Sequence, residues 1–311
     1  MDSLSASNGS FTLDLFKKLN ESFKGKNIFF SPWSISSALA MTYVGAKGNT
    51  ATQMAEVLHF KKTTGTGENV ISKFIVSFLK ESEDCKAEDI HSEFQALISL
   101  INKPQTSYLL KTANRLYEEQ TFQFHSTKTK PVQMMFLKDT FPICYLETMK
   151  VKIAELPYVN NDLSMLILLP DDIEDKSTGL EQVKPLYHIW TSPEMMKTTG
   201  VELFLPRIKL EESYNLKSTL SSMGMKDAFS QSQADFKGMS EHNDLFLSQV
   251  FHKSFVEVNE EGTEAAAASA VVVVVRSSLN HVRFKADHPF LFFIRHNKTN
   301  SILFFGRFCS P

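Results

Sequence analysis

One arginine stands alone at the end of a long stretch of small side chains. Arg276 is the only charged residue between Glu264 and His281, and it follows an alanine-rich run and five valines. An exposed guanidinium fits the acidic primary pocket of a protease that cleaves after arginine. The residues therefore predict a loop that can become a strand and that carries bait for a protease. An ordinary exposed loop arginine is the plainer interpretation.

The stretch ahead of Arg276 has two competing local preferences. Its alanines favour a helix, whereas Val271 to Val275 favour a strand. Side chains alternate between the two faces of a strand, and neither face of residues 263–274 would carry a bulky residue. Such a strand enters a sheet without steric conflict and gains about 0.5–1.5 kcal/mol for each ladder hydrogen bond. On composition alone, a helix start that leads into a buried strand remains an alternative.

Four blocks of the sequence resemble the serpin family, and their order along the chain agrees with it. The run that ends at Ser269 is similar to the proximal hinge of the serpin reactive-centre loop. Because no extension precedes Met1, the chain resembles the intracellular, ovalbumin-like branch, clade B. The matching blocks are residues 260–269, 27–36 with 45–50, 284–294 and 302–311.

The resemblance implies an α+β fold in which helices pack around mixed β-sheets and a reactive-centre loop, at about residues 260–283, is exposed. One serpin domain is expected over residues 1–311. Family spacing from Gly262 places the scissile bond at Arg276–Ser277; a register one residue earlier makes Val275 the bait for an elastase-like enzyme. The implied activity is suicide inhibition of a serine protease by loop insertion. The hinge residues are Glu260, Glu261, Gly262, Thr263, Glu264, Ala265, Ala266, Ala267 and Ala268.

By comparison with the family, a block is absent around residues 124–130, and its loss is expected to leave the main sheet incomplete. The lost block contains the third strand of that sheet, beside which the loop inserts in the family. The resemblance carries the shutter cluster onto Ser31, Ser34 and His252, but its partner asparagine belongs to the absent strand. We therefore expect weak or no inhibition, and a non-inhibitory or substrate-like serpin is the alternative function.

The bulk composition excludes several classes of protein. The chain has 311 residues, 42% of them hydrophobic, and a net charge of −2, so no strong field for nucleic acid or membranes is expected. Cys85, Cys144 and Cys309 are odd in number and far apart, which predicts free thiols. No signal peptide and no membrane-spanning run is recognised. The expected location is the cytoplasm, with the nucleus and release to the extracellular space left open.

No pattern predicts an enzyme, a metal site or a cofactor. The histidines lack metal-ligand spacing, and neither a nucleophile elbow nor a phosphate-binding glycine loop occurs. Lys61 and Lys62 are the only basic pair in the loop that some chromatin-associated serpins use for DNA, so nucleic acid is not an expected partner. The expected partner of the monomer is a trypsin-like serine protease, with a papain-like cysteine protease as a further alternative.

Hydrophobic periodicity predicts the elements of one mixed domain. Helices are expected near residues 11–23, 32–44, 50–58, 90–101 and 216–223, the last ended by Gly224. A polar loop is expected at 61–69. Strands are expected at 109–116, 132–136, 163–169, 201–210 and 245–258, and strands buried on both faces at 290–294 and 302–305.

Overall fold

The computed structural model describes residues 2–60, 109–113, 133–147, 149–158, 161–171, 195–240, 245–258 and 281–310. The predicted hinge, the Arg276–Ser277 bond, Cys85, the loop at 61–69 and the helix at 90–101 lie outside these residues. The described residues therefore include the segments on both sides of the predicted loop, residues 245–258 and 281–310.

Eight strands form one large sheet, which is antiparallel except for its last pair. The spatial order is β1-β11-β10-β5-β4-β3-β6-β9, and only β6 and β9 run parallel. These strands are β1 (Ile28–Phe30), β3 (Met134–Leu146), β4 (Val151–Pro157), β5 (Leu163–Pro170), β6 (Lys197–Pro206), β9 (Val282–Lys285), β10 (Phe290–His296) and β11 (Ser301–Phe308).

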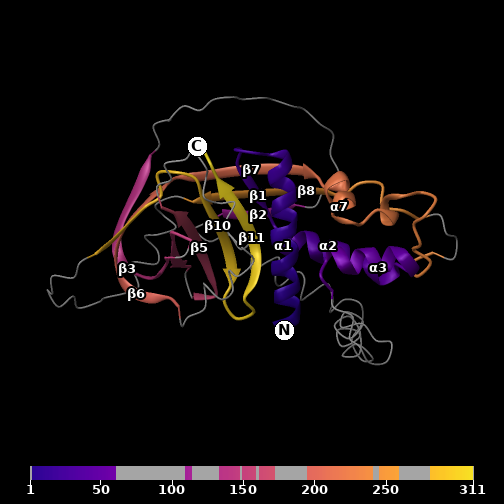
Figure 1. The fold of residues 1–311 in the computed structure, drawn as a ribbon, viewed down its shortest axis with the longest axis horizontal. Coiled ribbons are helices and arrows are strands. Elements are labelled where there is room, and N and C mark those ends of the chain that lie inside the picture. The colour runs from indigo at the N-terminus through magenta and orange to yellow at the C-terminus, as the bar shows by residue number, and fades with distance from the viewer. Residues whose placement is uncertain are drawn as a thin grey trace.

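A second sheet has three described strands in the order β2-β8-β7. Strand β8 (Phe251–Val258) lies in the middle, between β2 (Leu109–Ala113) and β7 (Ile208–Asn215), and both pairs are antiparallel. In Figure 1, β7 and β8 run across the upper part of the molecule, whereas β10 and β11 run up and down the view in opposite directions. In the predicted family fold, this three-stranded sheet corresponds to the main sheet.

In the described part of the chain, four α-helices and one short 3-10 helix accompany the sheets. Helix α2 (Pro32–Gly45) begins with Pro32 at its first turn, where the missing N–H costs no hydrogen bond. The other helices are α1 (Asp2–Ser22), α3 (Gly48–Val57), α7 (Lys217–Met223) and the 3-10 helix η3 (Asp227–Phe229). Helices α2, α3 and α7 gather at one end of the molecule, and β3 and β6 lie at the other (Figure 1).

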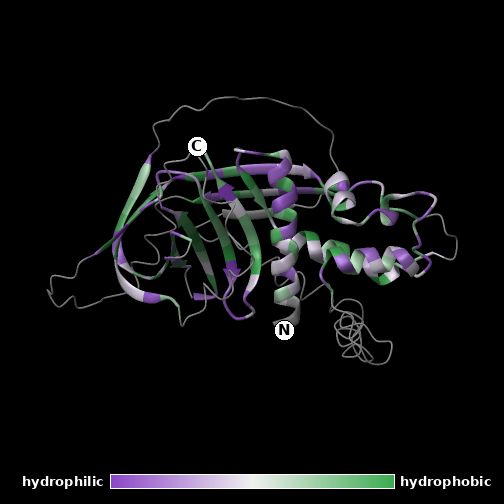
Figure 2. Cartoon of the chain, in the orientation of Figure 1, coloured by the Kyte–Doolittle hydropathy of each residue, from purple (hydrophilic) through white to green (hydrophobic). Residues whose placement is uncertain are grey.

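Aromatic side chains fill the core around β1, β10 and β11. The Phe29 ring stacks on Phe292 and Phe304 with centroid distances of 5.8 and 5.5 Å. Gly306 leaves room for this stack, because a Cβ atom there would lie 2.6 Å from the Phe292 ring. Apart from His296 at its end, β10 is buried, and so is all of β11, which confirms the prediction of strands buried on both faces. Figure 2 shows these central strands as largely hydrophobic.

Several predicted boundaries were wrong, and the strand expected at 132–136 runs on to Leu146 as β3. The single strand expected at 201–210 is two strands in different sheets, because Pro206 ends β6 and the Arg207 N–H bonds the Gln133 carbonyl instead. Residues 245–250 are not a strand, since the Leu247 N–H bonds the Ala228 carbonyl outside any sheet. Helix α1 begins at Asp2 rather than near residue 11.

Candidate functional site

The predicted reactive-centre loop is attached to a different sheet at each end. Strand β8 ends at Val258 in the three-stranded sheet, and β9 begins at Val282 on the edge of the eight-stranded sheet. The hinge residues and Arg276 belong to the chain between these two points. Any movement of that chain after a cut therefore starts from β8 on one side and from β9 on the other.

Strand β2 is the direct neighbour of β8. Five consecutive residue pairs align, from Leu109 opposite Glu257 to Ala113 opposite Lys253. The family resemblance places a third strand between the equivalents of these two strands. In the described sheet, β2 pairs with β8 at that place, so insertion next to β8 requires this ladder to open.

Two of the predicted shutter residues meet through a buried hydrogen bond. The Ser31 N–H donates to His252 Nε2 at 2.9 Å, and the Ser31 hydroxyl donates to the Leu303 carbonyl at 2.7 Å. Ser34 joins them through its backbone N–H, which donates to Ser31 Oγ at 3.2 Å. Ser31 thus caps the N-terminus of α2 and at the same time ties this helix to β8 and β11.

The second ring nitrogen of His252 is buried without a partner. His252 is 1% exposed, and its Nδ1 has no hydrogen-bond partner among the described residues. Because Nε2 accepts from Ser31, the neutral ring carries its proton on Nδ1, so the unpaired group is a donor. Burial lowers the pKa of His252 to about 4, which keeps the ring neutral at physiological pH. His252 is therefore a structural residue that lacks one acceptor.

Sequence reasoning missed further members of this polar cluster. The Ser254 hydroxyl donates to the Phe29 carbonyl at 2.7 Å, and the Phe29 N–H donates to the Tyr214 hydroxyl at 3.1 Å. Ser254 was detectable because it lies two residues after His252, on the same face of β8. Tyr214 stands opposite His252 across the β7–β8 ladder, and only the strand register reveals that. Together these side chains fasten β1 beneath the three-stranded sheet.

A carboxyl group lies half-buried on the same inner face. Glu212 stands opposite Ser254 in the β7–β8 register. Burial raises the pKa of Glu212 to about 7, and the positive charge of Lys26 opposes that shift only in part. The inner face of β7 therefore carries a group that titrates near neutral pH.

The family assignment follows from a comparison with known sequences. The sequence model of the family described as "Serpin (serine protease inhibitor)" matches residues 6–127 and 117–311. The chain is a serpin. The matched segments include the shutter residues, both loop anchors and the hinge, which confirms the resemblance on which the predicted α+β fold was based.

Curated relatives of this serpin include Serpin B10 from several mammals. The chain is 43% identical to human Serpin B10 over 403 aligned positions and 42% identical to the bovine protein over 407, with complete coverage of both chains in each case. Since the chain has 311 residues, at least 92 positions of the human alignment have no counterpart in it. The location of the missing block, around residues 124–130, stays a prediction.

Solved structures agree with the ovalbumin-like branch. Maspin matches with a TM-score of 0.75 and 30% identity over 100% of this chain and 99% of its own. Uncleaved ovalbumin matches with a TM-score of 0.75 and 29% identity over 99% of this chain and 100% of its own. A cleaved, loop-inserted ovalbumin mutant matches with a TM-score of 0.65 and 25% identity over 99% and 100%.

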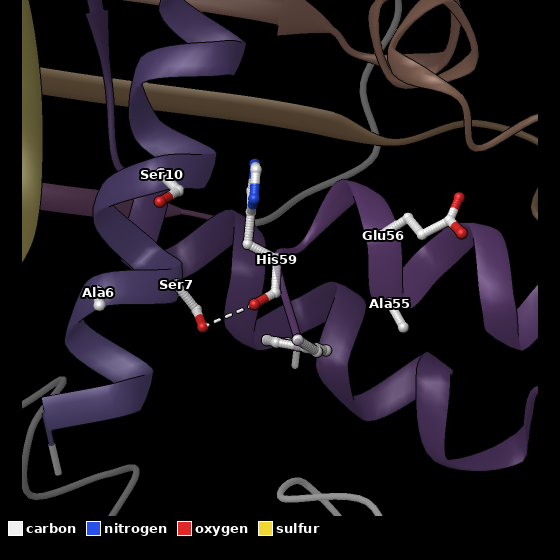
Figure 3. A pocket seen from close by; sticks show the side chains of 7 residues that line it. Ala6, Ser7, Ser10, Ala55, Glu56 and His59 are labelled. Atoms are coloured by element: carbon white, nitrogen blue, oxygen red, sulfur yellow. Dashed lines mark hydrogen bonds between the residues drawn. The ribbon is translucent and has the colours of Figure 1, made fainter. Parts of the chain in front are cut away.

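The serpin also has a cavity between α1 and α3, shown in Figure 3. Its volume is about 310 Å³. His59 lies at its rim with Nε2 2.8 Å from Asp14 Oδ2, and the Ser7 hydroxyl donates to the His59 carbonyl at 2.8 Å. The lining residues are Ala6, Ser7, Ser10, Ala55, Glu56, His59 and Phe60. The cavity is not formed by Ser31, Ser34 or His252, and no sequence motif marks it as a ligand site.

Metal-binding and membrane-spanning features were searched for in the described part of the chain. There, no group of three His, Cys, Asp or Glu side chains has a geometry that holds a metal ion. Among the same residues, no helix is both long and apolar enough to cross a bilayer. Cys144 is a buried free thiol, and Cys85 lies outside the described residues.

Proposed function

We propose that this serpin is an inhibitor of serine proteases that cleave after arginine, with Arg276–Ser277 as the bond attacked. One observation carries the proposal: the hinge sequence starts at Glu260, two residues after β8 ends at Val258. A strand that leaves the middle of a sheet through a run of small residues is positioned to continue into that sheet. The cytoplasm remains the location we propose for it.

The proposed mechanism uses the loop as both bait and new strand. The protease forms an acyl bond to Arg276 and releases the chain that begins at Ser277. The freed hinge then turns back along β8 and pairs with it as an antiparallel strand. Each ladder hydrogen bond formed is worth about 0.5–1.5 kcal/mol, but the β2–β8 ladder must open first.

A second candidate function, substrate-like cleavage without trapping, is favoured by the direction of β2. A loop that reverses from β8 would lie antiparallel to β8 and hence parallel to β2, because β2 and β8 are themselves antiparallel. Parallel pairing is slightly less stable per residue than antiparallel pairing. Insertion here therefore gains less than insertion between two strands that are both antiparallel to the loop, and deacylation has more time to compete.

The test is to mix the purified protein with trypsin and analyse the products on a denaturing gel. A complex that survives SDS supports inhibition, whereas a cut chain without a complex supports substrate behaviour. Sequencing the new N-terminus fixes the bait: a start at Ser277 supports the proposed bond, and a start at Arg276 indicates Val275. Papain, tested in parallel, covers cysteine proteases. An uncut loop in all mixtures would contradict the proposal.

A further inference from the structure

Three asparagines of this serpin stand in the sequence pattern that accepts an N-linked glycan. The Asn-X-Ser/Thr sequons begin at Asn8, Asn20 and Asn297, and none has proline in the middle position. An N-linked glycan is bulky and must extend into solvent from the side-chain Nδ2 atom. The folded protein can therefore carry a glycan only where Nδ2 is open to solvent and is not needed as a hydrogen-bond donor.

Asn8 lies on the side of α1 that packs against β11. It is 3% exposed, and its Nδ2 donates to the Ile302 carbonyl at 2.9 Å in a buried hydrogen bond. Its Oδ1 accepts from the Ser36 hydroxyl of α2 at 3.4 Å, so the whole amide is enclosed by neighbouring elements. A sugar on Nδ2 would have to occupy the interface between α1 and β11, and α1 could then not pack in its place.

Asn297, in the turn after β10, uses both hydrogens of its Nδ2 atom. They are donated to the Asn161 carbonyl at 2.8 Å and to the Ser164 hydroxyl at 3.0 Å, and Ser164 is 0% exposed. The Oδ1 atom of the same amide is buried as well. A glycosylated asparagine keeps only one hydrogen on Nδ2. The sugar would therefore displace one of these two partners and open the contact between this turn and β5.

Asn20, in the last turn of α1, differs because the protein uses its oxygen and not its nitrogen. Oδ1 accepts a hydrogen bond from Nη1 of Arg307, which is 3% exposed. A guanidinium has only donors, so the amide oxygen must face Arg307 and Nδ2 must point away from it. Nδ2 has no hydrogen-bond partner among the described residues, and it is not enclosed. A sugar on this nitrogen leaves the bond to Arg307 intact.

We propose that Asn20 is a site at which the folded protein tolerates an N-linked glycan, whereas a glycan on Asn8 or Asn297 prevents folding. Oligosaccharide is transferred to the chain in the secretory pathway before folding has buried any asparagine. A chain that enters this pathway with all three sequons is therefore modified at positions that the fold must later enclose. The protein folds when it is made outside that pathway, or when Asn20 alone is modified. This inference does not depend on the reactive-centre loop.

The first experiment places a cleavable secretory leader ahead of the full chain in mammalian cells and keeps one sequon at a time. The sequons are removed without touching the asparagines by Ser10→Ala, Ser22→Ala and Thr299→Ala, and the variant without any sequon sets the level of secretion. With the Asn20 sequon alone, glycosylated protein should reach the medium at that level. With Asn8 or Asn297 alone, glycosylated chains should stay in the cell. A secreted glycan on Asn8 or Asn297, or loss of secretion caused by the Asn20 sequon, would overturn the proposal.

The second experiment needs no glycan and uses protein made in the cytosol. An Asn→Asp change keeps the size of the side chain but replaces the Nδ2 donor by an acceptor. Asn8→Asp and Asn297→Asp should each lower the Tm by about 4–8 °C, because a carboxylate then faces an oxygen without a donor. Asn20→Asp should keep or raise the Tm, since its carboxylate faces Arg307, and Asn300→Asp, at an exposed position, is the matched control. If Asn20→Asp lowers the Tm as much as the other two, or if those two melt like the control, the proposed difference between the sequons is overturned even where no sequon is glycosylated.

Discussion

A disulfide between β2 and β8 tests the strand pairing that decides how the loop behaves. Ala113 and Lys253 are register partners. Opposed residues of an antiparallel pair have Cα atoms about 4.5–5.5 Å apart, within the range that a disulfide spans. The Lys253 side chain is 56% exposed and pairs with Glu211 on the surface, so its replacement disturbs no core contact. The double variant Ala113→Cys, Lys253→Cys should therefore crosslink on oxidation.

The size of the effect follows from the length of chain that the crosslink closes. Residues 113 and 253 are 140 positions apart. The chain-entropy model gives about 5 kcal/mol for a loop of that length, and real crosslinks deliver about 2–4 kcal/mol. In a domain of this size each kcal/mol raises the Tm by about 2 °C. The oxidised variant should therefore melt about 4–8 °C above its reduced form.

The assay measures melting and protease trapping in the oxidised and reduced states. Peptide mapping must show the 113–253 crosslink, since Cys85, Cys144 and Cys309 are also present. If the loop inserts between β2 and β8, oxidised protein is cut by trypsin without forming a complex, and reduction restores whatever trapping the wild type has. Each single-cysteine variant serves as a control. Cysteines that stay free under oxidation would refute the β2–β8 pairing, and equal trapping in both states would refute the insertion site.

Three further changes test the core, the buried carboxyl and the bait. Gly306→Val should destabilise the protein by about 1–3 kcal/mol, seen in urea unfolding, because its Cβ would meet Phe292. The raised pKa of Glu212 means that the folded state binds an extra proton between about pH 4.5 and 7, so stability falls as the pH rises through that range. Glu212→Gln should remove about 1–2 kcal/mol of this fall, allowing for solvent screening; equal slopes for both proteins would contradict it. Arg276→Ala should abolish cleavage by trypsin at that site, checked by N-terminal sequencing.

Sequence reasoning succeeded where one local signal was strong. The apolar runs of β10 and β11 and the stop at Gly224, where φ is 125°, needed no knowledge of distant contacts. The family resemblance supplied the contact between Ser31 and His252, which are 221 positions apart. Neither element periodicity nor composition contains that information, because it depends on how two sheets pack.

The sequence predictions that failed concern features that depend on tertiary packing. Residues 201–210 alternate like one strand, yet Pro206 lets the chain leave the large sheet and start β7 in the other. Tyr214 lies opposite His252 because of the β7–β8 register, which cannot be read from the sequence. The exposed pair Phe136 and Phe204 was also missed, because each ring taken alone looks like a core residue.

The unpaired donor of His252 and the β2–β8 ladder both contribute to the free energy of the proposed loop insertion. An unpaired buried donor costs about 1–3 kcal/mol, and the other tautomer would only transfer that cost to the Ser31 N–H. A strand that enters beside β8 with an acceptor near Nδ1 would recover this energy and add its own ladder bonds. In the proposed mechanism these gains oppose the cost of opening the β2–β8 ladder, because β2 stands where the third strand is expected. In that mechanism, the rate at which β2 leaves β8, measured against the rate of deacylation, separates inhibitory from substrate-like behaviour.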